Sequence, residues 1–222
     1  IPLRLVGSEM CIRDSYYPPG KNEVTIYPIG IGQLGGDTLT PTMVTTVSDK
    51  RANPTWTPTA NIRARYKARG IELPPVMPAG PDNPMGHHAI RLAAYGGVYL
   101  LHGTNADFGI GMRVSSGCIR LRESDIAALF AAVSPGTPVN IINTPIKASV
   151  EPDGTRLVEV HQPLSESIND DPKTLPIPLN AAIKAFQADA QSDAAVMEQA
   201  IELRSGMPVD VTKHAQESMQ AM

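Results

Sequence analysis

The sequence is poor in cysteine and in charge, and it has no long apolar run. Its 222 residues include two cysteines, Cys11 and Cys118, and only 18 % are Asp, Glu, Lys or Arg. No stretch approaches the roughly 20 apolar residues that a membrane-spanning helix needs. The net charge is −3 and no basic cluster is present, so nothing indicates nucleic-acid binding. We therefore expect neither a membrane span nor a nucleic-acid partner in this chain.

Proline and glycine, by contrast, are abundant, with 21 and 18 residues, which favours short strands and many turns over long helices. Alternating or β-branched patterns predict strands over 23–32, 42–47 and 138–144. Hairpins are predicted over 88–103, with a turn at 95–97, and over 146–162, with a turn at 152–154. The fold class is therefore predicted as mainly β.

Four short helices are predicted beside these strands. The first covers 61–70, from Asn61 as N-cap to Gly70. The second follows Cys118, and the last two follow a polar, proline-bearing linker at about 163–178. The apolar stripes of these three helices are Ile126/Leu129/Phe130/Val133, Leu179/Ile183/Phe186/Ala190 and Val196/Ala200/Leu203. The proline-rich segment 71–86 fits no regular element, and a long irregular loop of this kind is usually functional.

These elements divide the chain into four segments. Residues 1–15 (IPLRLVGSEMCIRDS) show neither strand alternation nor helical period, and we interpret them as a non-native or disordered leader. A β-rich domain is expected at 16–145, a hairpin and helical region at 146–211, and a tail at 212–222. Cys11 lies in the leader and is left out of functional reasoning, and a disulfide between Cys11 and Cys118 is not expected.

The second cysteine lies in the segment VSSGCIRL, at 114–121. His102 ends an apolar strand 16 residues upstream and is placed like a catalytic group on a rigid scaffold. A nucleophilic thiol needs a lowered pKa, and His102 is the candidate to provide this as its base. Gly117 permits a tight turn that aims backbone amides at a developing oxyanion, and Arg120 suits a substrate carboxylate. On the residues alone, an ordinary buried thiol stays an open alternative.

The segment HGTNADFGIGMRVSSGCIRLRESD resembles the motif of YkuD-type L,D-transpeptidases. The matching positions are His102, Gly103, Thr104, Ser115, Gly117, Cys118, Arg120 and Asp125. PPGKNEVTIYPIGIGQ, PAGPDNPMG and EVHQPLSESINDDP resemble the enterobacterial-type periplasmic subgroup, and the resemblance covers about 16–211. It implies a YkuD-type β-sandwich catalytic domain with one helix after the nucleophile, plus a small C-terminal hairpin and helical region.

The resemblance also implies a role for each matching residue. Cys118 attacks the carbonyl before the terminal D-alanine of a peptidoglycan tetrapeptide stem, and His102 moves the protons. The backbone carbonyl of Gly103 orients the imidazole. Amides around Gly117 and Cys118 form the oxyanion hole, and the turn itself can also aim the amide of Ser116 there. Arg120, Thr104 and Ser115 are expected among the residues that bind substrate. Ser116 departs from the histidine of many relatives, and we expect little effect because its backbone amide is the group used.

The acceptor of the acyl group stays open among three possibilities. It is a lysine of an outer-membrane lipoprotein, which would tether that protein to the wall, a diaminopimelate amine, which gives a 3–3 cross-link, or water. The subgroup resemblance favours tethering. A non-enzymatic wall-binding module is the remaining alternative, against which the intact His102–Cys118 pair argues. The resemblance further implies a periplasmic location and acylation by carbapenems, with no cofactor and no metal.

Relatives carry a further strand before the YYPPG segment, and often a LysM module and a signal peptide. We expect all three to be missing here.

Several other residues have weaker indications. His87 and His88 have one carboxylate nearby in sequence, Asp82, so a metal site is not expected. Arg91 and Tyr99 suit either the donor groove or the core. Three expectations complete the set: Trp56 as a core anchor, Asp125 as a helix-start residue, and His161 and His214 at the surface.

Overall fold

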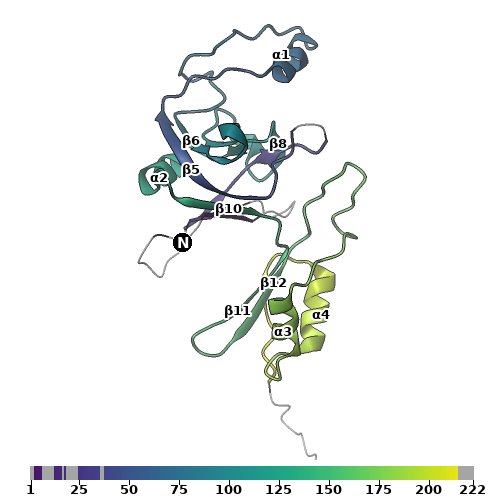
Figure 1. Ribbon diagram of the computed structural model, residues 1–222. Helices are drawn as coiled ribbons and strands as arrows, with labels where there is room; N and C mark the ends of the chain where they lie inside the picture. Colours follow the sequence, from purple (N-terminus) through teal and green to yellow (C-terminus); the bar gives the residue numbers. More distant parts are fainter. Residues whose placement is uncertain (1–2, 7–12, 17, 19–24, 36–37, 215–222) are drawn as a thin grey trace, which may run out of the picture. The chain divides into compact units, whose positions relative to one another are not determined.

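The computed structural model describes residues 3–6, 13–16, 18, 25–35 and 38–214, and the chain divides into two compact units (Figure 1). The first unit contains the described strands up to β10 together with helices α1 and α2. The second contains β11 to β13 together with α3 and α4. Each unit is described by itself below.

The first unit is built on one large sheet. Its order is β3-β2-β1-β10-β5-β6-β7-β9, with β1–β10 and β7–β9 parallel and the other neighbours antiparallel. A separate parallel pair joins β4 to β8. The strands are β1 (Leu3–Val6), β2 (Arg13–Tyr16), β3 (Thr25–Pro28), β4 (Ile31–Gly32), β5 (Met43–Ala52), β6 (His88–Leu92), β7 (Leu100–His102), β8 (Arg113–Ser115), β9 (Ile119–Arg120) and β10 (Pro138–Ile142).

Two α-helices and two single turns of 3₁₀-helix accompany this sheet in the described residues. They are α1 (Ala60–Lys67), η2 (Ala94–Gly97), η3 (Asp107–Gly109) and α2 (Glu123–Ala132). Helix α2 packs against β6 and buries Ile126 and Leu129 completely. The ammonium of Lys50 donates to the carbonyl oxygens of Phe130 and Val133 at the end of α2. A cation at this end also complements the helix dipole.

The three strands nearest the site carry two kinds of side-chain row. Ile90, Leu101 and Ile119 are aligned across β6, β7 and β9, and all three are fully buried. Successive side chains of a strand point to opposite faces. The neighbouring row, which contains His102 and Arg120, therefore points away from this apolar row. The buried row holds the strands, and the opposite face is available for the site.

The second unit is a three-stranded antiparallel sheet with two helices, and Figure 1 shows the helices beside the hairpin. Its elements are β11 (Ile146–Val150), β12 (Arg156–Val160), α3 (Ala181–Ala188), α4 (Ala194–Leu203) and β13 (Pro208–Asp210). Its core is made by Ile146, Val158, Val160, Ile183, Met197, Ala200 and Val211. Asn180 and Asp193 cap α3 and α4 through their side-chain oxygens.

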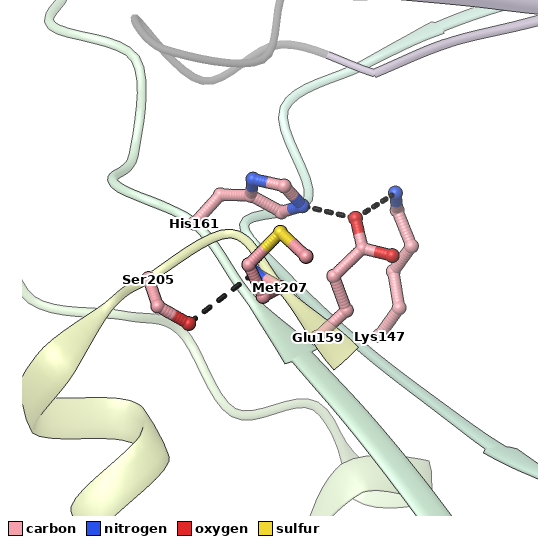
Figure 2. Close-up of polar contacts among 5 residues, drawn as sticks. All are labelled: Lys147, Glu159, His161, Ser205 and Met207. Atoms are coloured by element: carbon pink, nitrogen blue, oxygen red, sulfur yellow. Dashed lines mark hydrogen bonds and ion pairs between the residues drawn. The ribbon is translucent and has the colours of Figure 1, made fainter. Parts of the chain in front are cut away.

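A polar cluster lies at the end of β12 in this unit (Figure 2). The His161 imidazole contacts the carboxylate of Glu159, which also receives the Lys147 ammonium at 3.4 Å. His161 is only 2 % exposed, so the expectation that it lies at the surface is wrong. The adjacent carboxylate provides a polar partner for a ring that would otherwise lose its hydrogen bonds on burial. His214, in contrast, is exposed as expected.

The mainly β fold class is confirmed, as are both hairpins and the helix after Cys118. The predicted strand over 23–32 is divided into β3 and β4, because Gly30 forms a bridge to Arg120 instead. Helix α1 begins after Thr59, whose hydroxyl accepts from Ile62 N, and not after Asn61. Leu203, predicted on the inner face of α4, is 68 % exposed.

The structure also corrects part of the expectation for residues 1–15. β1 and the first residues of β2 lie within that range, and β1 pairs in parallel with β10 and antiparallel with β2. Backbone pairing uses the amide and carbonyl that every residue except proline carries. A strand can therefore form without the alternation of apolar and polar side chains by which the sequence analysis identified strands. The sheet continues past β10 through these strands, and Cys11 lies outside the described residues.

Candidate active site

A tight turn presents Cys118 between β8 and β9. The Ser115 hydroxyl donates to the carbonyl of Cys118 at 2.5 Å and accepts from Gly117 N at 3.1 Å. The Thr40 hydroxyl donates to the carbonyl of Gly117 at 2.8 Å. Gly117 has a φ of +108°, a conformation that glycine adopts without a Cβ penalty. The hydroxyl groups of Ser115 and Thr40 thus hold the turn through hydrogen bonds. The positive φ at position 117 favours the glycine that the sequence analysis singled out there.

His102 is buried at the end of β7, with 6 % of its surface exposed. Its Nδ1 lies 2.6 Å from the carbonyl oxygen of Gly103. A carbonyl can only accept, so Nδ1 carries the proton and Nε2 is left as the acceptor. This is the contact that the resemblance implies for Gly103, and it gives the ring the tautomer that a general base needs.

The β7–β9 pairing brings His102 and Cys118 into one cavity. His102 is in register with Arg120, Cys118 directly precedes β9, and all three residues line the same cavity. The cavity has a volume of about 660 Å³, and Cys118, His102, Ser115, Ser116 and Arg120 are among its lining residues. The parallel crossover from β7 to β9 therefore places the thiol and the imidazole in one cavity, where Cys118 Sγ donates to the carbonyl oxygen of Val98 at 3.8 Å.

Both reacting groups are uncharged at neutral pH. Burial lowers the pKa of His102 from 6.5 to about 4, against the effect of the Gly103 carbonyl, and the Arg120 charge adds to the lowering. Burial raises the pKa of the Cys118 thiol above 9.0, although the Leu100 amide and the charges of Arg120 and Arg91 oppose this. His102 is neutral in the resting protein and so adds no charge that would lower the thiol pKa, and its role as the base stays a prediction. The thiol must lose its proton during attack.

Two of the residues expected to bind the oxyanion or the substrate, Gly117 and Thr104, make hydrogen bonds within the protein. Gly117 N donates to the Ser115 hydroxyl, so in this structure it is engaged inside the turn. Thr104 is buried, its hydroxyl contacts the backbone of Ala106, and it does not line the cavity. The arrangement leaves Ser116 N and Cys118 N as the candidate oxyanion donors, and it gives Thr104 a structural role.

Glu123, in the first turn of α2, packs against the glycine that orients His102. A Cβ built on Gly103 would lie 1.9 Å from Glu123 Oε1, and one built on Gly86 would lie 1.6 Å from the same atom. The other oxygen of Glu123 accepts from His87 N at 3.1 Å. The loops at 86 and 103 can approach the Glu123 carboxylate only because glycine occupies both positions. Glu123 was not singled out from the sequence.

Some of the residues with weaker indications line the cavity and others do not. Arg91 lines the cavity, and Tyr99 packs edge-on against Tyr95. Trp56 lines the cavity and is half-buried, so it is not the core anchor that was expected. Asp125 lies in the first turn of α2, as predicted. His88 stacks near Phe130, and among the described residues no three His, Cys, Asp or Glu side chains gather in a metal-binding arrangement.

Three cavity residues lie on or just after α1 and carried no motif: Arg65, Tyr66 and Arg69. Arg65 Nη2 donates to the hydroxyl of Ser116 at 2.8 Å. Their spacing along NIRARYKAR is that of one helix face, which is the signal that could have found them. None of the helices in the part of the chain that the structure describes is long and apolar enough to span a membrane.

One cavity thus contains a thiol and a neutral imidazole that a backbone carbonyl orients, two groups that catalysis by a nucleophilic cysteine requires. Residues 13–141 match the family model described as the L,D-transpeptidase catalytic domain (YkuD). Residues 145–211 match the L,D-transpeptidase C-terminal domain. The chain belongs to the YkuD family of L,D-transpeptidases.

Two relatives from Escherichia coli agree with this assignment. The chain is 79 % identical over 203 residues to the probable L,D-transpeptidase YcfS of Escherichia coli, covering 91 % of this chain and 63 % of that protein. It is 51 % identical over 196 residues to the probable L,D-transpeptidase YbiS of E. coli, covering 87 % and 63 %. The chain thus spans less than two thirds of the length of these curated relatives. The solved L,D-transpeptidase from Mycobacterium smegmatis is similar with a TM-score of 0.43, at 22 % identity over 63 % of this chain and 58 % of that one.

Proposed function

We propose that this chain transfers an acyl group from a peptidoglycan tetrapeptide stem to an amine, through a thioester on Cys118. One observation supports this most: His102 is neutral, holds its proton on Nδ1 against Gly103, and shares a cavity with the thiol. An imidazole in this state can accept a proton at once, whereas an imidazolium cannot. A wall-binding module would need neither group.

In the first half-reaction the Cys118 sulfur attacks the carbonyl carbon that precedes the terminal D-alanine. The thiol proton passes to His102 Nε2, and the negative charge develops on the carbonyl oxygen, near Cys118 N and Ser116 N. His102 then gives its proton to the leaving nitrogen, the C–N bond breaks, and D-alanine departs. The result is a thioester and a neutral imidazole, ready for a second cycle of base catalysis.

In the second half-reaction a neutral amine attacks the thioester. Its proton passes to His102 and then to the departing sulfur, so the thiol is regenerated and a new amide bond forms. We propose a lipoprotein lysine as the acceptor, which makes the product a protein tethered to the cell wall in the periplasm. The basis is the subgroup resemblance, including the C-terminal region that matches its own family model. A diaminopimelate amine would give a 3–3 cross-link, and water a tripeptide.

The acceptor can be read from products. The purified chain is incubated with disaccharide-tetrapeptide, with and without a peptide that ends in the lysine of an outer-membrane lipoprotein, and the products are identified by mass spectrometry. Peptide adducts indicate tethering, dimers indicate cross-linking, and tripeptide alone indicates hydrolysis. A Cys118→Ala variant with undiminished activity would refute the mechanism, and a chain that releases no D-alanine would refute the proposed activity.

A further inference from the structure

The cavity that holds Cys118 is strongly cationic. Five arginines line it: Arg51, Arg65, Arg69, Arg91 and Arg120. Within the described part of the chain, no aspartate or glutamate lines it. Of the five, Arg51 alone has an ion pair among the described contacts, with Asp49 at 3.0 Å. Like charges gathered in a partly enclosed space raise the local concentration of an anionic ligand.

Of these arginines, Arg65 lies on α1 and Arg69 lies two residues after its end, and α1 is a helix that does not serve the core. None of its residues is buried. A two-turn helix gains little stability from its own hydrogen bonds, so packing normally has to hold it. The Thr59 cap and the 2.8 Å bond from Arg65 to the Ser116 hydroxyl are two of the contacts that hold α1. Ile62 and Tyr66 of α1 are half-buried where they line the cavity, so this helix lies at the cavity and not in the core of the unit.

The cavity side of α1 has a regular spacing. Ile62, Arg65, Tyr66 and Arg69 line the cavity, and they follow one another at i, i+3, i+4 and i+7. Arg63 and Lys67 lie between them in sequence and do not line it. The segment thus presents two guanidinium groups to the cavity and two further cations elsewhere. This division provides a matched pair of test and control positions.

We propose that Arg65 and Arg69 form a carboxylate-binding subsite that selects acyl donors with acidic side groups near the attacked bond. The inference rests on the proposed function, because its ligand is the acyl donor. A guanidinium fork matches a carboxylate in a bidentate manner, which a lysine cannot do. Arg65 is bonded to the residue two positions before the nucleophile, so a carboxylate held there lies near the thioester. Arg120, beside His102, remains the partner for a second carboxylate of the same donor.

The ligand is thus an acidic peptide with more than one free carboxylate. In a tetrapeptide stem the glutamyl and diaminopimelyl residues each keep a carboxyl group outside the attacked bond. Amidation of either group removes the charge and changes the size little. Comparison of the two amidated donors identifies which carboxylate the subsite binds.

The experiment measures kcat/KM for D-alanine release from the free tetrapeptide and from the two amidated tetrapeptides. We expect the wild-type chain to prefer the free donor over one amidated donor by about tenfold to a hundredfold, the usual value of a hydrogen bond to a charged group. Arg65→Gln and Arg69→Gln are expected to lose most of this preference. Arg63→Gln and Lys67→Gln remove the same charge from the same segment, and should keep it.

Two results would overturn the subsite. In the first, the Arg65→Gln chain discriminates between free and amidated donors as strongly as the wild-type chain. In the second, Arg63→Gln lowers the preference as much as Arg65→Gln does, which would indicate a general charge effect. Failure of the proposed function has a different outcome, because the wild-type chain would then release no D-alanine from any donor. Circular dichroism of each variant confirms that the fold is retained.

Discussion

Cys118 and His102 are both uncharged in the resting protein, and the pH dependence of thiol alkylation tests this directly. Iodoacetamide reacts with thiolate and not with thiol. A thiol with the ordinary pKa of 9.0 is about 1 % thiolate at pH 7, and burial places Cys118 below that fraction. If His102 instead held Cys118 as an ion pair, most of the sulfur would be thiolate, and alkylation at pH 7 would be about a hundredfold faster.

The assay follows alkylation by intact mass from pH 5 to pH 10, in a Cys11→Ser background so that only Cys118 is read. We expect a rate that rises tenfold per pH unit from pH 5 to about pH 8, without a plateau near neutrality, because the thiol pKa lies above 9.0. Exchange of His102 for Gln should change this rate by about threefold or less, because no ion pair is lost. D-alanine release should fall by about a hundredfold to ten-thousandfold in the same variant, since only acyl transfer needs the base.

A rate plateau between pH 5 and pH 8 that disappears in the His102→Gln chain would refute the reasoning. It would mean that the imidazolium and thiolate coexist before substrate arrives. The acid limb of kcat/KM offers a check on the base itself. Activity is lost as His102 becomes protonated, so the limb should lie near pH 4 and not near the ordinary histidine value of 6.5.

Four further outcomes are expected. A carbapenem should add its full mass to Cys118, because ring opening has no leaving group, and an unmodified intact mass after incubation would count against the acylation site. Gly117→Ala should cost about 1–3 kcal/mol in urea unfolding, since φ is +108° and the new Cβ lies 3.1 Å from a tyrosine ring; Gly136→Ala, with a positive φ in open space, should cost less. Lys50→Met should lose about 1–3 kcal/mol, through the two carbonyls at the end of α2. Between pH 6.5 and about pH 4, the free energy of unfolding of the wild-type chain should fall by about 3 kcal/mol relative to that of the His102→Gln chain, because only the unfolded state has a protonated histidine there. Above pH 6.5 the difference between the two chains should stay constant.

The elements that a local pattern could predict are those with a single periodic face. The hairpin of β6 and β7 and the stripe of α2 agree with the structure, because alternation and helical spacing act within one segment. The strand over 23–32 was predicted too long, since Gly30 pairs across the unit with Arg120. That partner lies 90 positions away, and no local pattern can indicate it.

The site residues that lie close together in the sequence could be predicted, whereas contacts between distant positions could not. His102, Gly103 and Cys118 lie within 17 positions and carry a family motif. The bond from Arg65 to Ser116 joins positions 51 apart, and its meaning depends on how α1 reaches the cavity. Protonation states were also hidden, because burial sets the pKa of His102 and sequence does not report burial. Trp56 was misjudged for the same reason, since a half-buried tryptophan and a core one look alike in sequence.

The absence of buried residues in α1 has a practical consequence for protein engineering. A segment that contributes nothing to the core can be exchanged without weakening the sheet that aligns Cys118 with His102. If Arg65 and Arg69 set donor preference as proposed, this preference depends on α1 and the residues just after it, whereas catalytic alignment depends on the pairing of β7 with β9. A library of variants at the cavity-lining positions of α1 and the residues just after it could be screened for new acyl donors, and we expect the thermal stability of these variants to stay constant.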